Sequence, residues 1–118
     1  MNMSFAEKEN TKANDEVTKI LSAQYRFGNH EGSTKLPEVL INNASFRDNI
    51  KSDIKYPRIG HFTEGRKKEL VDAYSSILDK HRILGVDQKF YSEIASQIVD
   101  KIIAAHQAKN RAAGLRAD

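Results

Sequence analysis

Apolar residues recur at every third or fourth position over residues 88–112, which is the pattern of one face of an α-helix. Asp87 precedes this segment as a candidate N-cap, and Gly114 follows it as a candidate stop. The residues that define the apolar face are Tyr91, Ile94, Ala95, Ile98, Val99, Ile102 and Ile103. The sequence therefore predicts a long amphipathic helix in this part of the chain.

A second helix is predicted over residues 64–82, with Thr63 as its N-cap. Its apolar stripe consists of Leu70, Val71, Tyr74, Ile77 and Leu78. Only residues 83–87 separate this helix from the one that follows, and a link this short favours neighbours that run in opposite directions. We therefore expect the two segments to form an antiparallel helical hairpin.

The pattern is weaker in the N-terminal half. Val17, Ile20 and Leu21 share one face of a helix predicted from about Asn14 to Phe27, where the following glycine ends it. The next residues, up to Lys35, are rich in Gly, Asn, Ser and Thr and are interpreted as a loop. We expect residues 1–13 and 115–118 to be flexible tails.

Two further helices are predicted before the basic segment. Pro37 suits the first position of a short helix, and Ser45 is a candidate cap for a helix over residues 46–54. Pro57 disfavours a helical conformation at the residue before it, so this helix is expected to end there. Residues 54–62 are then extended or turning.

These elements together predict an all-α fold, a small bundle of four to five helices built on the hairpin of residues 64–82 and 88–112. The alternative is an α+β fold with a minor edge strand near residues 54–62. Residues 14–114 are expected to form a single helical domain, because a chain of 118 residues supports one modest core.

Positive charge is concentrated in one segment. The chain carries 19 Lys and Arg against 16 Asp and Glu, a net charge of +3, and residues 55–68 alone carry +4. Residues 1–54 carry a net charge of −1, and residues 69–118 carry a net charge of zero. The charged and aromatic members of the segment are Lys55, Tyr56, Arg58, His61, Phe62, Glu64, Arg66, Lys67 and Lys68. Such a segment is either a solvated loop that leads into a helix or a binding surface.

The position of three of these cations favours a binding surface. Arg66, Lys67 and Lys68 fall in the first turns of the predicted helix, where the helix dipole disfavours each cation by about 0.3–1 kcal/mol. Acidic residues are the usual choice at such positions. Three unfavourable choices in succession indicate an anionic partner, and the free N–H groups of a helix start suit the same partner.

The residues needed for catalysis or metal binding do not form a recognisable set. His30, His61, His81 and His106 are scattered, and the chain has no cysteine. No nucleophile motif, phosphate-binding loop or dinucleotide fingerprint occurs. The sequence therefore predicts a protein that is not an enzyme, with no catalytic residue, no metal site and no cofactor.

These observations predict a non-enzymatic small regulatory or adaptor protein that acts by protein–protein binding, with a second copy of the chain as one candidate partner in a homodimer. The basic and aromatic residues expected to make the contact are Lys55, Tyr56, Arg58, His61, Phe62, Arg66, Lys67 and Lys68. Because the apolar face of the long helix is wider than one helix can cover, an interaction helix is also expected, with Tyr91, Ile94, Ile98 and Ile102.

The alternative is a small basic nucleic-acid-binding regulator that contacts phosphates through residues 55–68, in line with a sequence pI of about 9.2. No apolar run approaches the length of a membrane span, so no membrane partner is expected. No secretory signal is recognisable either, and a cytoplasmic location is expected.

Overall fold

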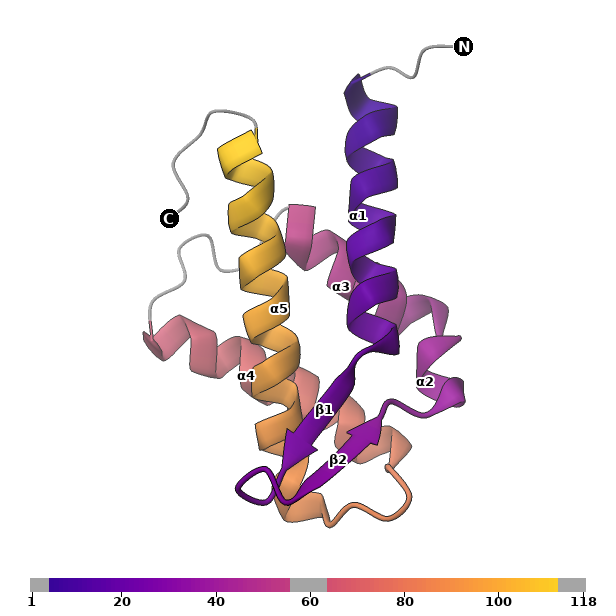
Figure 1. Cartoon of the computed structure of the whole chain (residues 1–118), viewed down its shortest axis with the longest axis vertical. Coiled ribbons are helices and arrows are strands. Elements are labelled where there is room, and N and C mark those ends of the chain that lie inside the picture. The colour runs from indigo at the N-terminus through magenta and orange to yellow at the C-terminus, as the bar shows by residue number, and fades with distance from the viewer. Residues whose placement is uncertain (1–4, 56–63, 113–118) are drawn as a thin grey trace.

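The computed structural model describes residues 5–55 and 64–112, with side chains described for residues 11–55 and 65–108. Helices make up 74% of this structure, together with one small antiparallel sheet (Figure 1). The helices are α1 (Phe5–Ser22), α2 (Glu38–Ile41), α3 (Ala44–Lys55), α4 (Glu64–His81) and α5 (Tyr91–Ala112), and the strands are β1 (Gln24–Phe27) and β2 (Gly32–Lys35). The prediction of a small all-α bundle is confirmed.

The two C-terminal helices lie where the apolar pattern predicted them. A short 3₁₀ turn, Gln88–Phe90, leads into α5, and the Asp87 carboxylate caps it by accepting from the backbone N–H of Lys89 at 3.1 Å. Figure 1 shows α4 crossing α5 at an oblique angle. The predicted pairing of these helices across a short link is therefore confirmed.

The helix predicted from Asn14 to Phe27 is wrong at both ends. α1 begins at Phe5 and ends at Ser22, and the last four residues of the predicted helix form β1. β2 lies within the predicted loop and pairs with β1 to form a hairpin. Alternation explains the strand, because Tyr25 faces the core while its neighbours Gln24 and Arg26 are exposed.

The predicted minor edge strand near residues 54–62 is not where the sheet lies. Ile54 and Lys55 are the last residues of α3, and residues 56–62 fall outside the described part of the chain. Of the predicted N-terminal tail, residues 5–13 are helical. Residues 1–4 and 115–118 lie outside the described part of the chain. The flexibility of both tails stays a prediction.

The start of α3 is capped two residues earlier than expected. The Asn43 side chain accepts a hydrogen bond from the backbone N–H of Phe46 at 2.9 Å. This is the geometry of an N-cap that bonds to the third helical residue, with Ala44 as the first. Asn43 therefore fills the capping role that the sequence assigned to Ser45.

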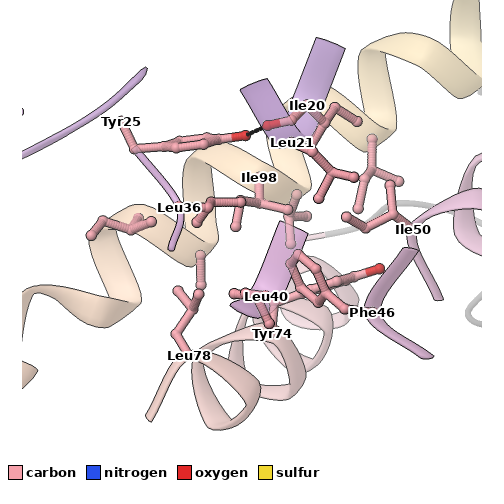
Figure 2. Close-up of a cluster of buried hydrophobic side chains, with 14 of the residues drawn as sticks. Ile20, Leu21, Tyr25, Leu36, Leu40, Phe46, Ile50, Tyr74, Leu78 and Ile98 are labelled. Carbon is pink, nitrogen blue, oxygen red and sulfur yellow. Dashed lines mark hydrogen bonds between the residues drawn. The ribbon is translucent and has the colours of Figure 1, made fainter. Parts of the chain in front are cut away.

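The core is assembled from every helix and from β1. Figure 2 shows Tyr25 reaching from the hairpin toward the end of α1, where its hydroxyl donates to the carbonyl of Ile20. Phe46 of α3 and Tyr74 of α4 meet edge to face with ring centroids 6.0 Å apart. The buried side chains drawn and labelled are Ile20, Leu21, Tyr25, Leu36, Leu40, Phe46, Ile50, Tyr74, Leu78 and Ile98.

Two polar contacts made by the end of α3 lie inside this apolar core. The Tyr74 hydroxyl donates to the carboxylate of the fully buried Asp53 at 2.8 Å, which connects α4 to α3. His106 of α5 lies 2.8 Å from the carbonyl oxygen of Ile54. Because a carbonyl oxygen only accepts, the histidine Nδ1 carries the proton. Both contacts hold the end of α3 against its neighbours.

Replacing Ile98 by Asp should unfold the protein or lower its free energy of unfolding by about 4 kcal/mol or more, because Ile98 is fully buried and the new charge has no partner. Ser92→Asp is the matched control, since Ser92 is exposed near the start of the same helix. Urea denaturation followed by circular dichroism measures both. Similar stabilities for the two variants would contradict the placement of Ile98 in the core.

Tyr25 should make stability fall at alkaline pH. Burial raises the pKa of Tyr25 above its ordinary value of 10.0, so the folded chain holds the phenol proton after the unfolded chain has lost it. The contribution is complete below about pH 10 and is lost above it, by about 1.4 kcal/mol per pH unit. In urea titrations on both sides of pH 10, Tyr25→Phe should lose less stability than the wild type. Equal losses would contradict the pKa shift.

Candidate binding surfaces

The structure describes half of the predicted basic and aromatic stretch. Lys55 ends α3 and is half-buried, and Arg66, Lys67 and Lys68 lie in the first turns of α4, as the sequence predicted. The other four predicted contact residues lie outside the described part of the chain, namely Tyr56, Arg58, His61 and Phe62. We call Arg66, Lys67 and Lys68 the basic start of α4.

Lys67 and Lys68 each form an ion pair within the chain. Lys67 Nζ lies 2.7 Å from Asp100 Oδ1 and so connects the start of α4 to α5. Lys68 Nζ lies 3.0 Å from Asp72 Oδ2, one turn further along α4, and both side chains are more than 60% exposed. An exposed pair of this kind contributes only about 0–1 kcal/mol. Lys67 therefore has a structural partner on another helix, whereas Lys68 remains accessible at the surface.

The predicted interaction helix is turned inward. Ile94, Ile98 and Ile102 are fully buried and Tyr91 is 3% exposed, all in contact with the core of their own chain. The Tyr91 hydroxyl also accepts from the backbone N–H of Ile83, 2.8 Å away. In this structure the four side chains pack inside the bundle, and their binding role stays a prediction.

The hairpin of β1 and β2 presents a second surface, which the sequence analysis interpreted as part helix and part loop. It is held against α5 by side chains of that helix. Gln97 accepts from the backbone N–H of Arg26 at 3.0 Å and donates to its carbonyl at 2.6 Å. The Glu93 carboxylate accepts from the N–H of Gly28 at 3.0 Å. The outer edge of β1 is therefore covered by α5.

The turn of the hairpin has a left-handed backbone. Gly28, Asn29 and His30 have φ values of 64°, 59° and 68°. Asn and His adopt this region more readily than other non-glycine residues, yet two in succession still carry a conformational cost. Beside the turn, the tilted rings of Phe27 and Phe90 pack with their centroids 5.4 Å apart. The turn therefore lies against Phe90, just before the start of α5.

The outward side of the hairpin is polar and slightly hollow. Four exposed side chains lie on it, and the strand register places them in two opposed pairs, Gln24 with Lys35 and Arg26 with Ser33. A hollow of about 460 Å³ opens over the turn end of this side, lined by Gln24, Arg26, His30, Glu31, Gly32 and Ser33. We call this surface, with Gln24, Arg26, Ser33 and Lys35 at its centre, the hairpin face.

Among the described residues, no group of three or more His, Asp or Glu side chains is arranged to hold a metal ion. His30 is exposed in the turn, His81 ends α4, and His106 is buried against Ile54, while His61 lies outside the described residues. In the same part of the chain, no helix combines the length and the apolar character needed to cross a bilayer.

Comparisons with protein-family models, with curated proteins and with solved structures gave no match to this chain. The interpretation of both surfaces therefore rests on their own geometry and charge.

Replacing Gln97 by Ala should loosen the hairpin, because the backbone N–H and C=O of Arg26 would both lose their partner. We expect a loss of about 1–3 kcal/mol in the free energy of unfolding. The amide proton of Arg26 should also exchange faster with solvent, as NMR measures. Gln107→Ala, on the same helix, should change neither. An unaltered Arg26 exchange rate in Gln97→Ala would contradict this anchoring.

Proposed function

We propose that the protein is a non-enzymatic regulatory or adaptor protein that acts by binding another protein, and that the basic start of α4 is its contact surface. The observation that supports this most directly is the exposure of Arg66 and Lys68 in the first turns of an 18-residue helix. Since the helix dipole favours acids there, these cations are poor choices for stability. A negatively charged partner would account for them.

The contact that Lys68 makes within the chain leaves it available to such a partner. Both side chains of the Lys68–Asp72 ion pair are exposed. Exchanging the Asp72 carboxylate for a partner's carboxylate therefore costs little free energy. Lys67 differs, because its contact with Asp100 connects two helices. Arg66 and Lys68 are therefore the proposed recognition residues, and Lys67 supports the helix that carries them.

The surrounding charges favour a protein over a nucleic acid as the partner of this surface. Glu69 and Asp72 are both exposed beside the cations. Carboxylates so close to a phosphate backbone would repel it, whereas alternating charges of both signs complement a protein surface and improve its specificity. Binding to a second copy of the chain stays a prediction.

Reversing two charges, Arg66→Glu with Lys68→Glu, should abolish partner binding. The melting temperature should hardly change, because acids suit a helix start and offset the lost pair with Asp72. Lys67 is left in place to keep its contact with Asp100. Affinity capture from the host lysate, with the bound proteins quantified for wild type and variant, measures the effect.

The matched control reverses two exposed charges elsewhere, Lys12→Glu on α1 and Arg47→Glu on α3. It should retain the captured proteins. Nuclease treatment of the lysate should leave capture by the wild type unchanged. Loss of all captured partners after nuclease, or equal capture by wild type and the Arg66/Lys68 variant, would refute the proposal.

A further inference from the structure

The hairpin face differs in chemistry from the basic start of α4. All four of its central side chains are exposed and polar, and none is a carboxylate or an apolar group. Side chains directly opposite on paired strands have Cβ atoms about 4.5–5.5 Å apart, so the four form a compact two-by-two arrangement. The core of a protein interface is normally apolar and aromatic, which this face is not.

The face carries two cations, Arg26 and Lys35, against one nearby carboxylate, Glu31. Arg26 and Lys35 lie on diagonal positions of the two strands, about 7–8 Å apart by the usual geometry of such pairs. Within the described part of the chain, neither side chain has an ion-pair partner. Glu31 lines the hollow at its turn end, together with Arg26. Two neighbouring cations of this kind complement an anionic ligand.

The shape of the element suggests which anionic ligand fits. A two-stranded β-ribbon has the width that the major groove of B-form DNA admits. Arg and Lys are the side chains that bind guanine edges, Gln binds adenine, and Ser binds either. The deep, narrow major groove of duplex RNA does not admit such an element. The anchoring of β1 by Gln97 and Glu93 also fixes the ribbon before it binds.

We propose that the hairpin face enters the major groove of double-stranded DNA, with Arg26 and Lys35 contacting phosphates or guanine edges and Gln24 and Ser33 contacting neighbouring bases. This is a binding activity beyond the proposed contact with a protein. Different residues form the two surfaces, so either activity can be lost without the other.

Fluorescence anisotropy with a labelled duplex DNA of mixed sequence, at low ionic strength, tests this activity on the full chain. We expect Arg26→Ala with Lys35→Ala to weaken binding about tenfold or more. The slope of log affinity against log salt should also become shallower by about two, since two cations are removed. Ser33→Glu, which adds a negative charge to the face, should weaken binding in the same direction.

Lys12→Ala with Lys80→Ala removes the same charge from exposed positions on α1 and α4 and is the matched control. It should retain nearly all of the affinity. Duplex RNA of the same sequence should bind more weakly than the DNA. Binding that depends on Arg26 and Lys35, is spared in the control and prefers duplex DNA supports the proposal.

Three results would overturn it. The first is no binding of the wild type to duplex DNA. The second is an equal loss in the hairpin variant and the Lys12/Lys80 control, because total charge alone would then explain the affinity. The third is binding of poly-glutamate as tight as that of duplex DNA with the same dependence on Arg26 and Lys35, which would point to an acidic protein segment instead.

Discussion

Burial of one face of α5 is the constraint on which the rest of the structure depends. Ile94, Ile98 and Ile102 are fully buried, and α1, α3, α4 and β1 all contact this helix. At roughly 25 cal/mol per Å² of apolar surface, each fully buried side chain of this size contributes about 1.5–3 kcal/mol. The apolar face looked too wide for one partner because several elements share it. A single helix therefore directly supports α1, α3, α4 and β1.

The polar side of the same helix positions the two candidate surfaces. Gln97 and Glu93 hold the hairpin, and Asp100 holds the start of α4 through Lys67. None of these three side chains is buried, yet each bonds to an element far away in the sequence. The surface of α5 is thus organised by specific hydrogen bonds and one ion pair, as its buried side is organised by packing.

Local sequence was sufficient where local interactions decide the structure. The 3.6-residue apolar period and the Asp87 cap define α4 and α5, and both helices were predicted to within a few residues.

Local sequence was insufficient at Gln24–Phe27. The alternation of Tyr25 and Phe27 with polar neighbours was a strand signal, and Gly28-Asn29 a turn signal, but four residues are too few to outweigh a preceding helical pattern. The strand is held by hydrogen bonds from Gln97 to the backbone of Arg26, 71 residues away in the sequence. The basic start of α4 was visible as a run of charge, whereas the hairpin face depends on strand register and was not.

The two hydrogen bonds that anchor the hairpin require a spacing on α5 equal to a spacing along the strand. Glu93 and Gln97 are four residues apart, which is a rise of about 6 Å along α5. The N–H groups that they bind, on Gly28 and Arg26, are two residues apart along an extended chain, a distance of about 6.7 Å. The two spacings coincide closely enough for both bonds to form together. Inserting one residue between Arg26 and Gly28 would put the second N–H out of reach and turn every later side chain to the opposite side of the ribbon. Residues 29–31 contribute to neither bond, so the length of the hairpin can vary at its tip while the strand that faces α5 keeps its length.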